Sequence, residues 1–260
     1  MKSILLHIDG DNCLPARLQV ALDIARATKG HITCLQPVSY EIFAPGDFYG
    51  SALAAAIPRI REAAEKLRAQ IEEQLSDEDV SWEWQFVHGM AEDRLLDQSA
   101  LHDLILVGPN DKGEASGGRP SALAGGLAIR APVPVMVVPG HMKGFDVTGP
   151  ALVAWNGSSE ASVALRAAVP LLMLADKVVI ASVSEAAAKE RLAFRSRDAA
   201  RYLARYGVEP EVQFIEKGDA KVSDALFAAA GELGCGLFVM GAYGHSRLAE
   251  MLLGGVTRRS

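Results

Sequence analysis

Glycines near the end of the chain have the spacing of a loop that binds phosphate groups. Gly241 and Gly244 follow an apolar run, and Gly254 and Gly255 come after nine further residues. Glycines at a strand-to-loop turn let backbone amide groups approach an anion closely, and the start of a following helix adds its positive dipole end. Thr257 adds a hydroxyl group to this set. The pattern predicts a cradle for a polyphosphate.

A second loop is expected to flank the same cradle. The apolar run 152–155 is followed by Asn156 and Gly157 and then by a helical pattern. In open parallel sheets, ligands bind beyond the carboxyl ends of the strands, where the strand order reverses. That point lies between the first and fourth strands of such a unit, so Asn156 and Gly241 are expected to border one crevice.

The elements that position these loops occur twice in the chain. Ile4–Gly10 and Leu152–Ser158 are apolar runs that lead into Asp-Gly and Asn-Gly, and Asp103–Gly108 matches Gly236–Gly241. The order of the matching segments is kept while their spacing drifts, which is typical of a duplication followed by loop changes. The sequence therefore predicts a tandem repeat of one α/β unit.

The expected strands are continuous apolar runs, so helices must cover both faces of each sheet. Helical patterns fall between the strands, at Pro15–Thr28, Ala52–Leu75, Ala161–Leu174 and Glu185–Tyr206. This alternation predicts an α/β fold of two tandem Rossmann-like, doubly wound units, with parallel five-stranded sheets. A seam rich in proline and glycine, Pro139–Pro150, divides the chain into domains of residues 1–141 and 150–260.

The second unit is expected to be truncated before its fifth strand. The first unit closes with the apolar run 131–138, and the matching position of the second copy lies beyond Ser260. We therefore expect four strands in the second sheet. The last helix, which begins at Gly255, would be only about one turn long, and helices that short are marginal without packing.

The pattern Gly241-x2-Gly244-x9-Gly254, directly after an expected fourth strand, resembles the nucleotide signature of the universal stress protein family. The resemblance covers essentially the whole chain, as a tandem pair. In that family the glycines hold the ribose and the phosphates, and the ends of the first and second strands hold the adenosine. The resemblance implies binding of ATP or AMP, with or without Mg²⁺. By position, the residues that it implies in binding are Asn156, Val183, Gly241, Gly244, Gly254 and Gly255. Their neighbours Trp155, His245, Val256 and Thr257 complete the expected binding set.

Two of these residues depart from the family pattern. Asn156 replaces the usual aspartate, which removes a charge and keeps a hydrogen-bonding side chain. Gly255 stands where serine or threonine is usual, so a hydroxyl group is lost. Because an amide is a poorer ligand for Mg²⁺ than a carboxylate, we expect nucleotide affinity to depend only weakly on Mg²⁺.

The first copy keeps the family's acidic residue, Asp9, but loses the later glycines of the motif. Its frame reads Gly108-x2-Asp111-x9-Ser121. A carboxylate at position 111 would repel a phosphate group in a partly dehydrated site. We therefore expect nucleotide binding mainly in the second domain, and a structural or dimer-forming role for the first. The strand 133–138 is expected to join two chains into a homodimer.

Composition excludes several kinds of partner. The chain has 26 Lys and Arg against 32 Asp and Glu, a net charge of −6, so it lacks the basic surplus that nucleic acids or anionic membranes attract. No apolar run approaches the roughly 18 residues of a membrane span. The early acidic residues Asp9 and Asp11 are atypical of a signal peptide, and three cysteines without paired spacing favour a reducing compartment. We expect a cytoplasmic protein.

Other motifs fail at specific positions. A P-loop over Gly108–Gly113 lacks its lysine, because Glu114 follows, and a nucleophile elbow around Ser246 lacks its second glycine, because Leu248 stands there. Asp9–Asn12 is interpreted as a turn instead of a calcium loop. The histidine spacings support no metal site. We assign no catalytic residue and expect at most slow, incidental ATP hydrolysis.

Two functional hypotheses follow. The first is a stress-response protein that binds an adenine nucleotide, ATP or AMP. The second is a nucleotide-free stress-response scaffold that acts through protein–protein contacts. The intact glycine spacing of the second copy favours the first hypothesis, whereas Asn156 and Gly255 favour the second.

Overall fold

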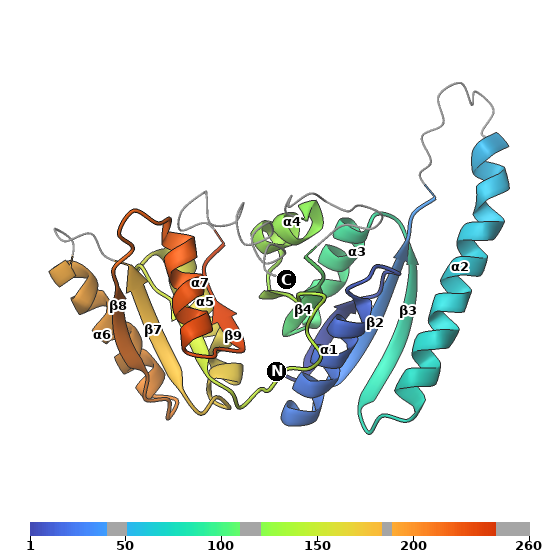
Figure 1. Cartoon of the computed structure of the whole chain (residues 1–260). Helices are drawn as coiled ribbons and strands as arrows, with labels where there is room; N and C mark the ends of the chain where they lie inside the picture. The colour runs from blue at the N-terminus through green and yellow to red at the C-terminus, as the bar shows by residue number, and fades with distance from the viewer. Residues whose placement is uncertain (41–50, 110–120, 184–188, 243–260) are drawn as a thin grey trace. The chain divides into compact units, whose positions relative to one another are not determined.

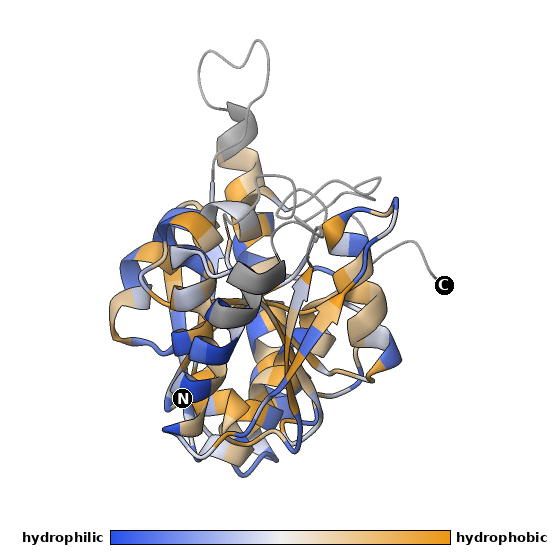
Figure 2. Ribbon diagram, turned by 90° about the vertical axis from the view of Figure 1, so that its left-hand side faces the viewer, coloured by the Kyte–Doolittle hydropathy of each residue, from blue (hydrophilic) through white to orange (hydrophobic). Residues whose placement is uncertain are grey.

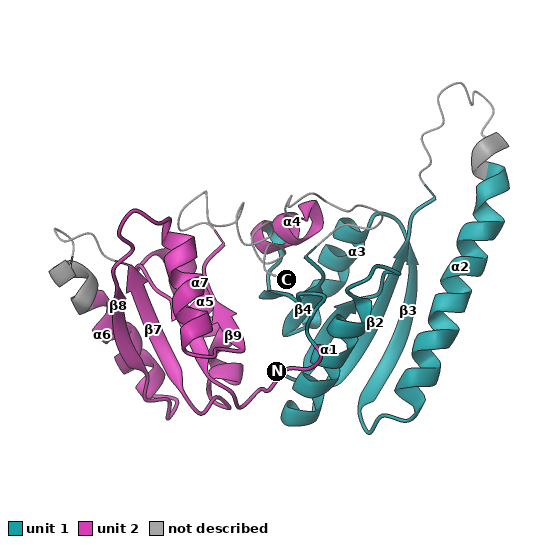
Figure 3. Ribbon diagram, in the orientation of Figure 1, with its two compact units in different colours: residues 1–113, 130–142 teal, residues 114–129, 143–260 magenta. Residues whose placement is uncertain are grey.

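The computed structural model describes residues 1–40, 51–109, 121–183 and 189–242 (Figure 1). The chain divides into two compact units (Figure 3). Unit 1 comprises residues 1–113 and 130–142, and unit 2 comprises residues 114–129 and 143–260. The segment 114–129, which includes most of helix α4 (Ala122–Arg130), thus groups with unit 2.

Unit 1 is built on a parallel sheet of five strands in the order β3-β2-β1-β4-β5. Its strands are β1 (Ser3–His7), β2 (His31–Val38), β3 (Ser81–His88), β4 (Leu104–Val107) and β5 (Val135–Val137). Its helices are α1 (Leu14–Thr28), α2 (Ser51–Ser76), α3 (Ala91–Gln98) and the 3₁₀ turn η1 (Ser99–Leu101).

Unit 2 repeats the first four strands of this order as β8-β7-β6-β9, again all parallel. Its strands are β6 (Ala151–Ala154), β7 (Val178–Val183), β8 (Glu211–Ile215) and β9 (Leu237–Val239). The helices between them are α5 (Ser159–Leu172), α6 (Lys189–Ala204) and α7 (Val222–Glu232). The register is also repeated, because Ala151 of β6 faces Leu237 of β9 as Ile4 of β1 faces Leu104 of β4.

Burial explains why the strand sequences are continuously apolar. Ala151 and Val153 of β6 lie in a core cluster with residues of α5 and α6, whereas Leu152 belongs to a second cluster with residues of α7. Alternate residues of one strand therefore pack on opposite faces, each covered by helices. Hydrophobic residues accordingly run along the strands in Figure 2.

Helix α1 has clear local signals at both ends. Pro15 occupies its first turn, where no backbone N–H partner is needed. Lys29, directly after the helix, has a left-handed conformation (φ 50°) and donates its N–H to carbonyls of the last turn. Its buried stripe includes Leu14, Leu18 and Ala21.

These features confirm the predicted fold class, two tandem doubly wound units with parallel sheets. In the part of the chain that the structure describes, the second sheet has four strands, as expected. Among the helices in the described part of the chain, none is both long enough and apolar enough to cross a bilayer.

Candidate functional site

The carboxyl end of β6 is held to its neighbours by a buried polar network. The N–H of Trp155 donates to the carbonyl of Ala181 at 2.8 Å, and the carbonyl of Trp155 accepts from the Ser182 hydroxyl at 2.8 Å. The Ser182 Oγ lies 3.1 Å from the Oγ of Ser196, and both serines are fully buried. Strands β6 and β7 and helix α6 are thereby fixed together just before Asn156.

The loop after Trp155 is a tight turn that starts α5. The side-chain oxygen of Asn156 accepts from the N–H of Ser158 at 2.9 Å, and Gly157 has a φ of +73°. The Ser158 hydroxyl accepts from the N–H of Ala161 at 3.2 Å, so Ser158 caps the helix. One of the two lone pairs of the Asn156 oxygen is therefore used within the loop, and the NH₂ group of Asn156 can donate to a ligand.

Gly241 brings the end of β9 against this same helix start. A side-chain carbon at position 241 would lie 2.7 Å from the nitrogen of Ala161 and 2.7 Å from the carbonyl carbon of Glu160. Both are backbone atoms, so no rotamer change could relieve the collision. The absence of a side chain at Gly241 thus allows the loop after β9 to approach the amide groups at the start of α5.

Charges of both signs flank the start of α5. Hydrogen bonds from its own backbone amide and from the hydroxyl groups of Ser158 and Ser159 keep the pKa of the Glu160 carboxyl below its usual range. On the other side, Nη1 of Arg195 in α6 lies 3.4 Å from the carbonyl oxygen of Gly157. In the described part of the chain, no carboxylate forms an ion pair with this guanidinium. The sequence did not indicate Arg195 as a residue of the candidate site, because it lies in a helix outside the glycine motif.

Gly157 is expected to tolerate no side chain, for two separable reasons. Its φ of +73° strains any residue with a Cβ, and a Cβ would also lie 2.5 Å from Cδ of Arg195. Gly157→Ala is expected to lower the free energy of unfolding by about 2 kcal/mol, roughly half from strain and half from displacement of Arg195. Urea denaturation measures this change.

Gly207→Ala is the matched control for that variant. Gly207 has a φ of +78°, but a side-chain carbon at this position would meet no atom within 4 Å, so the control carries the strain without the collision. We expect a loss of about 1 kcal/mol there. Equal losses at Gly157 and Gly207 would contradict the proposed packing of Arg195.

The structure places four of the residues implied in binding at one edge of the second sheet. Trp155 and Asn156 follow β6, Val183 is the last residue of β7, and Gly241 follows β9. Because β6 pairs with both β7 and β9, these ends are adjacent. The other residues implied in binding lie outside the described residues: Gly244, His245, Gly254, Gly255, Val256 and Thr257.

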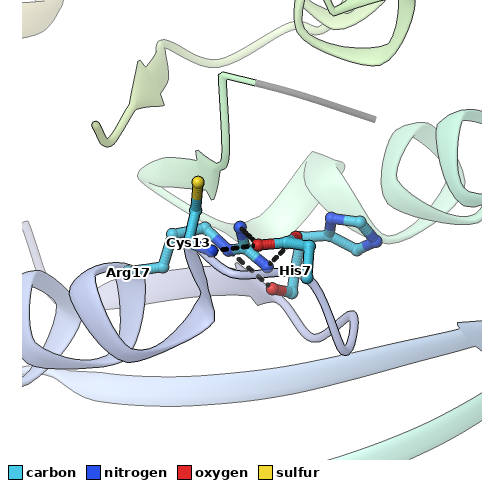
Figure 4. Close-up of polar contacts among 4 residues, drawn as sticks. His7, Cys13 and Arg17 are labelled. Carbon is cyan, nitrogen blue, oxygen red and sulfur yellow. Dashed lines mark hydrogen bonds and ion pairs between the residues drawn. The ribbon is translucent and has the colours of Figure 1, made fainter. Parts of the chain in front are cut away.

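The matching edge of unit 1 holds a buried ion pair that no sequence motif indicated (Figure 4). Arg17, with a fully buried side chain, donates to both carboxylate oxygens of Asp11, at 3.1 and 2.8 Å. Its Nε donates to the carbonyl of His7, the last residue of β1, at 3.2 Å. A weaker signal was present in the sequence, because Arg17 interrupts the buried stripe of α1 between Leu14 and Leu18.

Cys13 and Gly140 lie next to this ion pair. The N–H of Cys13 donates to Asp11 at 2.6 Å, and a side-chain carbon at Gly140, after β5, would lie 2.7 Å from the Cys13 sulfur. Burial is the main cause that raises the pKa of the Cys13 thiol, with a further contribution from the Asp11 charge. Asp111 of the degenerate motif lies outside the described residues, whereas Ser121 accepts from the N–H of Ala124 at the start of α4.

No family model matches the chain, and no curated protein matches it either. Solved structures do. A universal stress protein from Archaeoglobus fulgidus is 19% identical, with a TM-score of 0.71 over 92% of this chain and 86% of that one. A putative universal stress protein from Pseudomonas aeruginosa UCBPP-PA14 is 20% identical, with a TM-score of 0.56 over 97% and 89%. A functionally unknown protein from Pseudomonas aeruginosa PAO1 is 19% identical, with a TM-score of 0.57 over 97% of this chain and 89% of that one.

These matches run over nearly the full length of both chains, so they concern the two-unit architecture and not a single sheet. The chain has the universal stress protein fold. The resemblance that the glycine motif indicated is confirmed at this level.

Proposed function

We propose that the chain is a stress-response protein of the universal stress type that binds an adenine nucleotide, ATP or AMP, mainly through its second domain. The observation that carries the proposal is the approach of Gly241 to the backbone of Glu160 and Ala161. This contact brings the loop that begins the glycine motif to a helix N-terminus at the carboxyl edge of a parallel sheet. Negative charge is favoured at such a position because the positive end of the helix dipole lies there.

The proposal keeps the two domains at residues 1–141 and 150–260 and assigns the protein to the cytoplasm. It includes no catalytic residue. The ten positions of the expected binding set stay the proposed one, with Arg195 added as a cation beside the loop that carries Asn156. The ionised carboxylate of Glu160, at the start of α5, repels the charge of a phosphate. The positive charge of Arg195 offsets this repulsion.

The state of Asn156 supports a weak dependence on Mg²⁺. Its only side-chain oxygen already accepts a hydrogen bond from the Ser158 N–H. Mg²⁺ prefers charged oxygen ligands in a near-octahedral arrangement, and the neutral amide oxygen of Asn156 is a weaker ligand than a carboxylate. The NH₂ group of Asn156 can instead donate to a ribose oxygen or to a ring nitrogen of the base.

Calorimetric titration with ATP tests the proposed function and the location of the site together. Gly244→Asp is expected to abolish binding, because it puts a side chain and a negative charge where backbone amides must approach phosphate. Asp9→Ala, in the first domain, is expected to leave the affinity unchanged. Titrations with and without millimolar Mg²⁺ are expected to differ by less than about threefold, within roughly 0.7 kcal/mol.

Equal losses from Gly244→Asp and Asp9→Ala, on protein shown to be folded, would contradict the assignment to the second domain. A strong dependence on Mg²⁺ in the unsubstituted protein would contradict the role given to Asn156.

A nucleotide-free scaffold is the second candidate function, favoured by the engagement of the Asn156 oxygen within its own loop. A scaffold binds no ATP in the same titration and carries no nucleotide after purification. Native mass spectrometry of freshly purified protein distinguishes the two candidates, since retained ATP or AMP adds a defined mass.

We also propose a homodimer that forms through the strand region 133–138. Strand β5, at the edge of the first sheet, is only half-buried, and unpaired edges recruit partners. Light scattering at tens of micromolar, roughly the range in which weak interfaces appear, is expected to give twice the chain mass of 27.6 kDa. A mass of one chain under these conditions would contradict the dimer.

A further inference from the structure

The guanidinium of Arg17 lies where a doubly wound sheet normally accepts its ligand. It contacts the last residue of β1 through the His7 carbonyl, and a side-chain carbon at Gly108, directly after β4, would collide with its Nη1. Strands β1 and β4 are neighbours at the point where the strand order of unit 1 reverses. Ligands of open α/β sheets bind outside the carboxyl ends of the strands at this point.

Side chains of unit 1 lie in this space. The side chain of Arg17 is 0% exposed and that of Asp11 is 10% exposed, so the ion pair has little contact with solvent. Cys13 lies beside Gly108, and Gly140 packs on its sulfur from the segment after β5. Both carboxylate oxygens of Asp11 are engaged by the guanidinium, in the bidentate arrangement that a phosphate group also adopts with arginine.

The corresponding positions of unit 2 carry no such pair. Counted from the last residues of β1 and β6, Arg17 corresponds to Ala164 and Asp11 to Ser158. Neither residue of unit 2 is charged. There the glycine after the fourth strand, Gly241, lies directly against the backbone of α5, with no long side chain between them.

We propose that the Asp11–Arg17 ion pair closes the ligand crevice of unit 1, with the Asp11 carboxylate taking the place of an anionic ligand on the guanidinium. The first unit is then closed to nucleotides by its own side chains, and the residues at positions 17 and 164 determine which unit binds. The closure is a property of unit 1 alone. Only the identity of the excluded ligand rests on the proposed function.

Labelling of Cys13 with N-ethylmaleimide measures the closure without any nucleotide. The double variant D11S/R17A gives unit 1 the residues of unit 2, and we expect Cys13 to react at least about tenfold faster than in the unsubstituted protein, because the crevice is open to the reagent without unfolding. Peptide mass mapping identifies the labelled cysteine. Cys34 is the internal control, since burial in β2 raises its pKa to about 12 and only unfolding exposes it. Equal rates at Cys13 in both folded proteins overturn the proposal.

The variant D11N/R17M keeps the test decisive if D11S/R17A also exposes Cys34. Methionine and asparagine keep most of the volume of the pair and remove its charges. If the pair closes the crevice by filling it, N-ethylmaleimide labels Cys13 in this variant as slowly as in the unsubstituted protein. Fast labelling of Cys13 in this variant, with Cys34 protected, overturns the proposal.

Counting bound ATP per chain separates the inference from the proposed function. We expect one ATP per chain, and none in Gly244→Asp. Two ATP per chain, or one that persists in Gly244→Asp, overturns the closure of unit 1 and leaves nucleotide binding as a function. No ATP in any protein, together with faster labelling of Cys13 in D11S/R17A, overturns the proposed function and supports the closure.

Discussion

Arg17→Ala is expected to lower the free energy of unfolding by about 3–5 kcal/mol, because removal of one partner leaves the other charge of a buried ion pair uncompensated. Asp11 is nearly buried and loses both of its guanidinium contacts. The carbonyl of His7 loses its donor as well. Urea denaturation monitored by circular dichroism measures the loss.

Arg26→Ala provides the matched control on the same helix. Arg26 pairs with Asp23 and Glu78, but its side chain is 40% exposed, and exposed ion pairs contribute about 0–1 kcal/mol. The double variant D11S/R17A is expected to lose much less than the sum of the two single losses, since neither charge is then left alone. A loss at Arg17 no larger than the loss at Arg26 would contradict the buried pair.

Gly241→Ala is expected to destabilise unit 2 by about 1–3 kcal/mol, the usual range for a group forced into a filled space. The added carbon meets backbone atoms of Glu160 and Ala161 at 2.7 Å, so either the loop after β9 or the start of α5 must move. Movement of either one separates the glycine motif from the helix amides. ATP affinity is therefore expected to fall at least about tenfold, or roughly 1.4 kcal/mol.

Gly236→Ala, at the other end of β9, is the matched control for this prediction. A side-chain carbon there would make ordinary contacts with the ring of Phe145, the shortest at 3.8 Å. Stability and ATP affinity are both expected to stay within about 0.5 kcal/mol of the unsubstituted protein. Unchanged ATP affinity in folded Gly241→Ala would refute the approach of this loop to the ligand.

The architecture could be predicted because its signals are local and repeated. Apolar runs such as 104–107 and 237–239 became strands, and the duplicated order of segments indicated two units with the same strand order. Helix α1 begins at Leu14 and ends at Thr28, within a residue of the predicted range, because Pro15 and the residues after Thr28 mark both boundaries. These features depend on neighbours in the chain and need no knowledge of tertiary contacts.

The fine structure of the candidate site could not be predicted in this way. The link from Trp155 through Ser182 to Ser196 joins two strands and a helix, and neither serine belongs to a motif. The burial of Arg17 contradicts the usual preference of arginine for the surface, so only the contact with Asp11 explains it. Side-chain pairing across elements decides both cases, and single-residue patterns do not encode it.

The buried position of Arg17 also constrains how the two copies could have diverged from one ancestral unit. A step that places arginine at position 17 before aspartate stands at position 11 passes through a protein with a lone buried charge, which selection for stability would remove. Aspartate at position 11 without Arg17 also leaves a nearly buried charge uncompensated, and this is the state that Arg17→Ala creates. The two substitutions are therefore epistatic, because, whichever state is older, both single-substitution paths between the two copies run through a destabilised intermediate.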